Sequence, residues 1–134
     1  MTTCQKGDVA VLKVATRAVE KGWIPSRPIP ESARYDLVLD DGKRLHRCQV
    51  KWANGKANGA VVCQLTRHNG SGVNTERKYH AHEVDAVLVY IPKLDEVVWL
   101  TPDDFEDKFI VTLRYEPAKN NQRSGCIMVA DRVW

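Results

Sequence analysis

The chain has 134 residues, of which 43% are hydrophobic, and its formal net charge is +3. A chain of this length can bury a core without disulfide bridges, so we expect one domain over residues 1–134. Its four cysteines lack paired spacing, no apolar run is long enough to span a bilayer, and no secretion signal precedes the first expected helix. Composition therefore argues against a secreted disulfide scaffold and a membrane protein, and favours a cytoplasmic protein in a reducing compartment.

Charge is distributed unevenly along the chain. Residues 1–82 hold 14 Lys and Arg against 7 Asp and Glu, residues 83–108 hold 2 against 8, and the remainder holds 4 against 2. The basic first part fits a protein that turns one side toward a polyanion such as nucleic acid. Chance clustering of charge on a solvated surface is the alternative interpretation.

The first predicted element is a helix over residues 8–21, because apolar residues recur there at helical spacing. Asp8 is its predicted N-cap and Gly22 its predicted end. The simplest role of its apolar stripe, which includes Val11, is core packing. Three prolines fall within residues 24–30, which predicts an extended connector because proline cannot continue a helix.

Two strands are predicted next, at residues 35–39 and 45–51, joined by an Asp-Asp-Gly turn. Side chains alternate between the two faces of a strand, so Gln49 and Lys51 share one face of the second strand. Asp36 on the paired first strand can then converge with them. The sequence thus predicts a carboxylate, an amide oxygen and an ammonium at one place.

These three groups suit the hydrolysis of a phosphodiester. Asp36 and Gln49 offer the oxygen ligands that Mg²⁺ prefers. Lys51 places a positive charge beside the attacking water or the phosphate, where negative charge grows in the transition state. We therefore predict Asp36, Gln49 and Lys51 as catalytic residues. The alternative is that they are ordinary polar residues on the solvated face of an antiparallel hairpin.

Four further strands and a short capped helix are predicted in the second half of the chain. The strands lie at residues 60–65, 86–91, 96–100 and 109–115, and the helix begins at Thr101. Residues 66–83 show no periodic pattern, are basic, and form an expected inserted loop. Long ordered loops are often functional, so we expect this loop to follow a DNA backbone. A hairpin without DNA contact is the alternative.

Basic residues in this loop and in other stretches are predicted to contact DNA. They are Arg27, Arg34, Arg67, Arg77, Lys78, Lys119 and Arg123. The loop also carries His68 and His80, which together with His82 and Cys63 invite a zinc interpretation. Their spacing does not match the usual paired ligand modules, so the sequence disfavours a zinc site.

Five motifs follow one another along most of the chain: Lys6-Gly7-Asp8, Lys21-Gly22-Trp23, Arg34-Tyr35-Asp36-Leu37-Val38, Gln49-Val50-Lys51 and Leu113-Arg114-Tyr115-Glu116-Pro117-Ala118-Lys119-Asn120. Their order resembles the PD-(D/E)XK nuclease superfamily, and is more closely similar to its group I intron-encoded homing endonucleases. The resemblance implies an α/β (α+β) fold with a restriction-endonuclease-like core, a central mixed sheet and an N-terminal helix. It also implies site-specific, Mg²⁺-dependent cleavage of double-stranded DNA. Asp36, Gln49 and the Val50 carbonyl would hold the ion, and Lys51 would activate water.

The chain departs from that family pattern at two positions. Gln49 replaces a carboxylate, and Val11 stands where family members usually carry a glutamate in the first helix. The second departure implies weakened or absent cleavage, unless Asp8, three residues earlier, takes over the role. A cleavage-deficient DNA-binding protein and a nuclease resembling junction resolvases are therefore the alternative functions. Because cutting both strands needs two sites, we expect a homodimer or a homotetramer.

Overall fold

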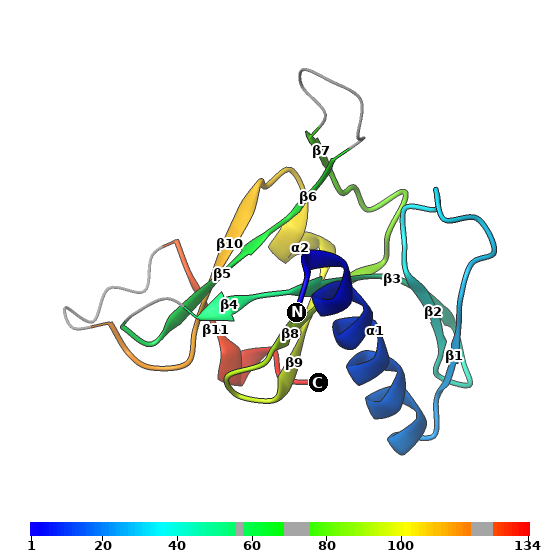
Figure 1. Cartoon of the computed structure of the whole chain (residues 1–134), viewed down its shortest axis with the longest axis horizontal. Helices are drawn as coiled ribbons and strands as arrows, with labels where there is room; N and C mark the ends of the chain where they lie inside the picture. Colours follow the sequence, from blue (N-terminus) through cyan, green and yellow to red (C-terminus); the bar gives the residue numbers. More distant parts are fainter. Residues whose placement is uncertain (56–57, 69–75, 119–124) are drawn as a thin grey trace.

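The structure is a computed structural model that describes residues 1–55, 58–68, 76–118 and 125–134, and within these the side chains of residues 67–68 and 76–77 are not described. Its longer elements lie in two sheets and one long helix (Figure 1). In chain order the elements are α1 (Thr3–Glu20), β1 (Ile24–Ser26), β2 (Leu37–Asp40), β3 (Leu45–Trp52), β4 (Asn54–Gly55), β5 (Ala60–Gln64), β6 (Thr66–His68), β7 (Glu76–Lys78), β8 (Ala86–Ile91), β9 (Glu96–Leu100), α2 (Pro102–Phe105), β10 (Ile110–Arg114), β11 (Ile127–Met128) and a 3₁₀ helix η1 (Val129–Asp131).

Helix α1 begins earlier than the sequence pattern predicted. Thr2 is its N-cap: the Thr2 hydroxyl accepts a hydrogen bond from the Gln5 backbone N–H (3.2 Å), and the Gln5 side-chain oxygen accepts one from the Thr2 N–H (2.8 Å). This reciprocal pair is a capping box, which satisfies two of the free N–H groups at a helix start. The prediction that Asp8 caps the helix is therefore wrong, and Asp8 lies inside the helix. The predicted end is confirmed, because Gly22 follows the last turn with a left-handed φ of +80°.

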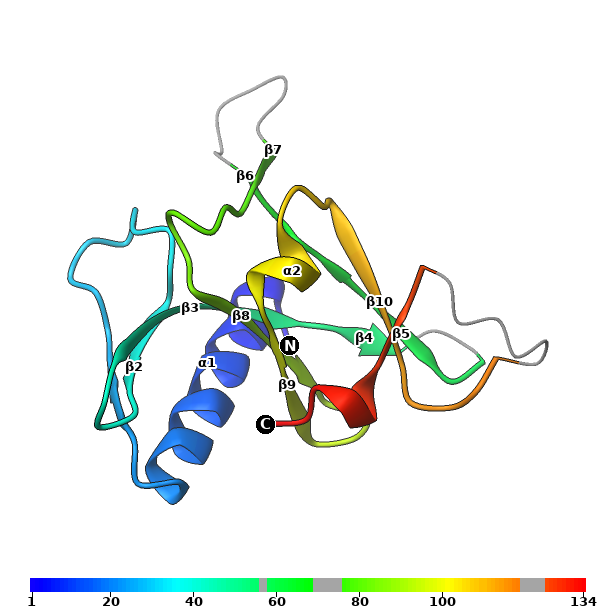
Figure 2. The ribbon, with the colours of Figure 1, turned by 180° about the vertical axis from the view of Figure 1, so that it is seen from behind.

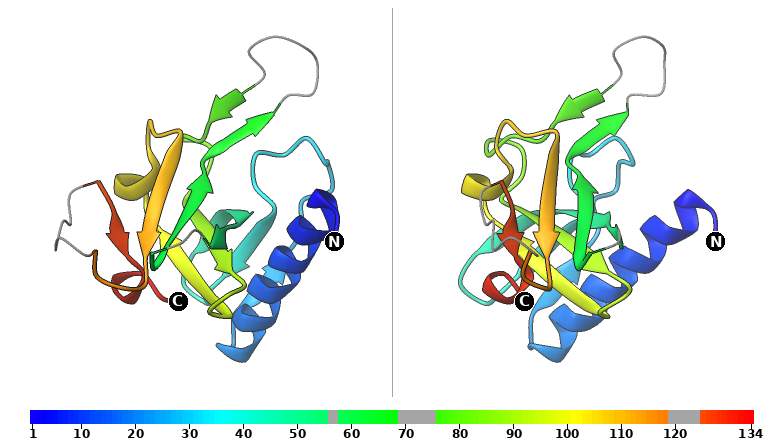
Figure 3. Two further views of the ribbon diagram at one scale, coloured as in Figure 1. Left: turned by 60° about the vertical axis from the view of Figure 1, so that its left-hand side comes forward. Right: turned by 90° about the vertical axis from the view of Figure 1, so that its left-hand side faces the viewer.

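The five-stranded sheet is mixed, with the strand order β1-β2-β3-β8-β9. Strands β3 and β8 are parallel, and the other neighbours are antiparallel. Part of the predicted extended connector is strand β1, which pairs with β2. Helix α1 covers one face of this sheet (Figure 3). The buried residues between helix and sheet include Ala10, Val14, Leu37, Cys48, Val50 and Leu88.

The second sheet has the order β11-β10-β5-β4 and packs near the opposite face of the first (Figures 2 and 3). Its buried residues, including Val61 and Leu113, form one core cluster with Val87 and Val89 of β8. Val87 and Val89 alternate along β8 with Ala86 and Leu88, which face α1. The mixed central sheet therefore lies between the helix and the second sheet, as the predicted fold class requires. Within the described part of the chain, no helix is both long and apolar enough to cross a bilayer.

Strands β6 and β7 form an antiparallel hairpin that projects away from both sheets (Figure 1). They lie in the segment whose sequence showed no periodic pattern. Contacts at the base of the hairpin tie it to the segment after α2: Lys78 Nζ pairs with Asp107 Oδ1 (2.9 Å), and the Ala81 N–H donates to Glu106 Oε2 (2.6 Å). The hairpin base is therefore fixed to the body of the protein.

Candidate active site

Asp36 and Gln49 are in direct contact. Asp36 directly precedes β2, and its N–H donates to the Cys48 carbonyl (2.9 Å), so the antiparallel pairing of β2 with β3 brings it beside Gln49. Asp36 Oδ2 accepts hydrogen bonds from Gln49 Nε2 (2.7 Å) and from the Val50 N–H (2.9 Å). The Gln49 residue is only 8% exposed. The structure thus brings the predicted carboxylate and amide together, through the amide nitrogen and not the predicted oxygen, and their role in catalysis stays a prediction.

Alternation along β3 places Gln49 and Lys51 on the face of the sheet away from α1. Their neighbours Cys48 and Val50 belong to the cluster packed against the helix. Because successive side chains of a strand point to opposite faces, Gln49 and Lys51 project to the other side. The same alternation that predicted their shared face from sequence therefore holds in the structure.

Lys51 reaches the base of the β6–β7 hairpin. Its Nζ donates to the Thr66 carbonyl (2.9 Å) and lies 4.9 Å from the centroid of the Tyr79 ring. Tyr79 is 1% exposed and directly follows β7. Sequence reasoning missed both Thr66 and Tyr79, because they lie in the segment without a periodic pattern. The sequence signal for Tyr79 would have been an aromatic residue at the end of a basic strand, and that signal alone is weak.

Two of the predicted DNA-contacting residues are engaged within the protein. Arg34 forms an ion pair with Glu83, donates to the Lys78 carbonyl (2.8 Å), and stacks its guanidinium 4.6 Å from the Tyr79 ring centroid. Its side chain is 16% exposed. Lys78 pairs with Asp107 and lies over the Phe109 ring. These contacts stabilise the hairpin base, and a role of either residue in binding DNA stays a prediction.

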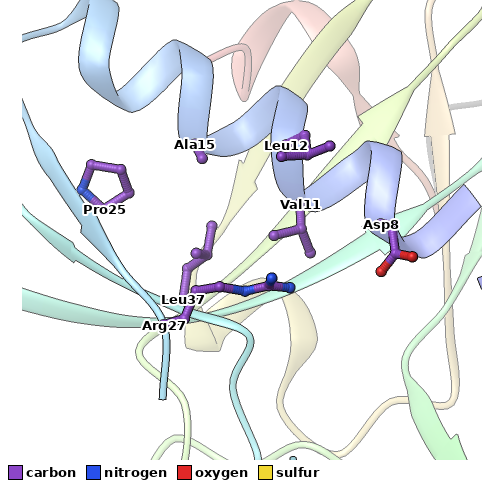
Figure 4. A pocket seen from close by; sticks show the side chains of 7 residues that line it. All are labelled: Asp8, Val11, Leu12, Ala15, Pro25, Arg27 and Leu37. Carbon is purple, nitrogen blue, oxygen red and sulfur yellow. The ribbon is translucent and has the colours of Figure 1, made fainter. Parts of the chain in front are cut away.

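Arg27 is exposed and lines two cavities. A cavity of about 350 Å³ is lined by Arg27, Tyr35 and Asp36, among others. A second, of about 400 Å³, is lined by Arg27 together with Asp8, Val11 and residues of β1 and β2. Figure 4 shows the Val11 and Asp8 side chains pointing from α1 toward the side on which the Arg27 guanidinium lies. Asp8 and Val11 therefore line a cavity that shares Arg27 with the cavity beside Asp36.

The remaining predicted DNA contacts lie where side chains are not described. Arg67 and Arg77 are paired residues of β6 and β7, and only their backbone is described. Lys119 and Arg123 fall outside the described residues. All four stay predictions.

The structure gives no support for a zinc site among the residues that it describes. No group of three or more His, Cys, Asp or Glu side chains there is arranged to hold a metal ion. His80 instead pairs with Glu106 (3.0 Å) and stacks on His82. Burial raises the pKa of the Cys63 thiol to about 12, against the opposing effect of the Lys51 charge, so Cys63 is not a thiolate at neutral pH.

Asp36, Gln49 and the Val50 carbonyl form a set of hard oxygen donors. Such a set suits Mg²⁺ better than the softer metals that prefer thiolate or imidazole. Gln49 now directs its amide nitrogen toward both Asp36 and the Val50 carbonyl (3.3 Å). Rotation of the Gln49 side-chain amide by half a turn would point its oxygen, in place of its nitrogen, toward the same place. The residues therefore fit a magnesium ion chemically, with one carboxylate supplying the negative charge.

Comparison with known proteins agrees with the fold. A family model described as PD-(D/E)XK endonuclease matches residues 1–131. The solved structure of a bacterial homing endonuclease, I-Ssp6803I, is similar in fold with a TM-score of 0.79 and 23% sequence identity, over 99% of this chain and 89% of that one. No curated protein matches the chain. The predicted superfamily and its mixed-sheet core are thereby confirmed, and the chain belongs to the PD-(D/E)XK endonuclease family.

Proposed function

We propose that the chain is a Mg²⁺-dependent, site-specific endonuclease for double-stranded DNA, of the homing-endonuclease type. Family membership supports DNA endonuclease activity in general. The observation that carries the specific proposal is the 2.7 Å contact between Asp36 and Gln49, with Lys51 on the same face of β3. A carboxylate, an amide and an ammonium are residue types that a metal-assisted phosphodiester hydrolysis can use.

Asp36, Gln49 and the Val50 carbonyl would hold the ion. When bound, Mg²⁺ polarises the scissile phosphate and lowers the pKa of a bound water. The negative charge of Asp36 would attract the cation, and the neutral oxygens of Gln49 and Val50 would be the protein's other ligands. Because Asp36 also accepts a hydrogen bond from the Val50 N–H, which a turn of the Gln49 amide leaves in place, its carboxylate is already oriented before any ligand arrives.

Lys51 acts on the reacting groups. Its ammonium orients the attacking water and offsets the negative charge that grows on the phosphate oxygens. The water oxygen forms a bond to phosphorus, and the bond from phosphorus to the 3′ oxygen breaks. A proton ends on that oxygen, which leaves a 3′-hydroxyl and a 5′-phosphate.

Arg27 is the best-placed cation for holding the DNA backbone near this site, because it is exposed and borders the cavity that Asp36 lines. A guanidinium matches the phosphate group in geometry as well as in charge. The hairpin, with Arg67 and Arg77 on its strands, projects away from both sheets (Figure 1), and its role in the proposal is to follow the duplex. Cutting both strands needs two such sites, so the proposal includes a homodimer or homotetramer.

A sequence-specific DNA-binding protein without cleavage is the second candidate. One observation favours it: Val11 is 9% exposed and packs in the core under α1, so no carboxylate arises from that position. Under this alternative, Asp36 and Gln49 would keep their hydrogen bond in the presence of Mg²⁺, and the fold would serve only to present basic residues to DNA.

The proposal is tested by cleavage and binding on the same duplex. A target is first selected from a library of random duplexes by its affinity for the protein. Wild type should nick or cut this target with Mg²⁺, and Lys51→Ala should lose cleavage at least 100-fold, a typical order for a group that stabilises transition-state charge, with little change in affinity. Lys43→Ala, at an exposed lysine of the β2–β3 turn, is the matched control.

The outcomes separate the candidate functions. Binding by wild type without any cleavage would support the DNA-binding protein. Preferential cutting of four-way junctions over linear duplex would support a resolvase-like nuclease. Normal cleavage by Lys51→Ala would refute the assigned mechanism.

A further inference from the structure

The Lys51 ammonium, at the end of a flexible side chain on β3, is fixed by contacts outside that strand. It is held between two partners that both belong to the base of the β6–β7 hairpin: the Thr66 carbonyl at 2.9 Å and the Tyr79 ring, whose centroid is 4.9 Å away. Thr66 pairs with Lys78 in the hairpin register, and Tyr79 is the next residue along the chain. The same end of the hairpin therefore supplies both contacts of the Lys51 ammonium.

Tyr79 is itself fixed in place. It is 1% exposed, and its ring is also contacted by the Arg34 guanidinium at 4.6 Å. Arg34 in turn pairs with Glu83 and donates to the Lys78 carbonyl, which closes the contacts around the hairpin base. A buried ring that carries two cations on its surface is a rigid electrostatic support, since the face of an aromatic ring is negative.

We propose that Tyr79 is a positioning residue for the catalytic lysine, and that the hairpin base sets the place of the Lys51 ammonium on the face of β3 that Gln49 shares. This inference rests on the proposed function of Lys51. Lysine has a long flexible side chain, and positioning it in advance saves the entropy of ordering it in each catalytic cycle. The same contacts connect the DNA-facing hairpin to the reacting groups.

The first test uses the wild-type protein in solution. An aromatic ring shifts the resonances of protons above its face upfield, so the Lys51 Hε protons should resonate upfield of those of other lysines. Their signals are assigned by their loss in Lys51→Arg. Tyr79→Phe should keep the shift because it keeps the ring. Unshifted Lys51 Hε protons in wild type would overturn the proposal.

The second test is single-turnover cleavage of a selected duplex, with affinity and thermal stability measured on the same samples. Tyr79→Phe should cleave within about twofold of wild type, and Tyr79→Leu should cleave about tenfold more slowly at unchanged DNA affinity, from the usual strength of a partly desolvated cation–π contact. Tyr115→Leu is the matched control, since it removes a similar contact with Lys93 (5.3 Å) at the far end of β10.

The outcomes distinguish this proposal from the proposed function. If Lys51→Ala is inactive but Tyr79→Leu cleaves as fast as Tyr79→Phe, the positioning role alone is overturned. If Tyr79→Leu lowers affinity and cleavage by the same factor, Tyr79 acts only on DNA binding, and the positioning role is again overturned. If Lys51→Ala cleaves normally, the proposed function fails and this inference fails with it.

Discussion

Gln49→Glu would place two carboxylates where an amide and a carboxylate now meet. Gln49 Nε2 donates to Asp36 Oδ2 at 2.7 Å. The substitution removes that hydrogen bond and sets two negative charges about 3 Å apart, a repulsion on the order of 5 kcal/mol at an effective dielectric constant of about 20. The metal-free variant should therefore unfold more easily than wild type, unless the pair takes up a proton.

Uptake of a proton by the carboxylate pair limits the loss of stability in Gln49→Glu and makes that loss depend on pH. Protonating a glutamic acid with an ordinary pKa of about 4.3 costs about 4 kcal/mol at pH 7 but only about 1 kcal/mol at pH 5. The like-charge pair has a raised pKa in the folded state, so its destabilising effect grows as pH rises. We expect the free energy of unfolding to fall by about 4 kcal/mol at pH 7, and by about 1 kcal/mol at pH 5.

Magnesium should reverse most of the effect. A second carboxylate strengthens the ion's binding, and an ion at 100 times its dissociation constant would restore about 2.7 kcal/mol. Urea unfolding at both pH values, with and without Mg²⁺, measures all of these differences. Gln64→Glu, at an exposed glutamine of β5, is the control and should change little. A loss of stability that is equal at pH 5 and pH 7 and indifferent to Mg²⁺ would refute the reasoning about this pair.

The remaining predictions concern the first helix and the region around α2. Val11→Glu should lower the free energy of unfolding by about 2 kcal/mol, the usual cost of a polar group at a buried position. It should also raise Mg²⁺-dependent cleavage, because Val11 lines a cavity that shares Arg27 with the cavity beside Asp36. Val19→Glu, at a 61% exposed position of the same helix that lines neither cavity, should change neither property, and equal behaviour of the two variants would count against the assignment. Burial alone would raise the pKa of Asp104, but hydrogen bonds from Arg132 and Thr101 lower it below its usual value. This carboxylate therefore stabilises the fold above pH ~4, and its contribution is lost as pH falls further. Asp104→Asn should lower the free energy of unfolding by about 2 kcal/mol at pH 7 and by much less near pH 2. A loss of stability that is independent of pH would contradict the pairing with Arg132 (2.9 Å).

The strands of the central sheet were predictable wherever apolar side chains run together. Strands β8 and β9 have the predicted bounds, because Ala86–Ile91 is buried throughout and Glu96–Leu100 nearly so. The start of α1 was not predicted, because Asp8 and Thr2 are both good cap residues and the spacing of Thr2 and Gln5, which is that of a capping box, was overlooked. Strand β1 was missed because its central residue is a proline, which is typical of connectors and edge strands alike.

The residues of the candidate site also fall into those that the sequence could predict and those that it could not. Asp36, Gln49 and Lys51 could be found because strand alternation is a local rule, and the turn between β2 and β3 fixes their register. The partners of Lys51 could not, because Thr66 and Tyr79 reach it from the hairpin and no local pattern marks them. The contacts that Arg34 makes within the protein could not be predicted for the same reason, because its partner Glu83 is far along the chain.

The most direct test of the central claim is where a divalent ion binds. Crystals soaked in Mn²⁺, which takes the same oxygen ligands as Mg²⁺ and scatters anomalously, should show one peak about 2.1 Å from an Asp36 carboxylate oxygen and from the Gln49 amide oxygen, with the amide turned from its present hydrogen bond. A peak elsewhere, or an Asp36–Gln49 hydrogen bond that persists at saturating Mn²⁺, would contradict the claim that these residues form the metal site of a nuclease.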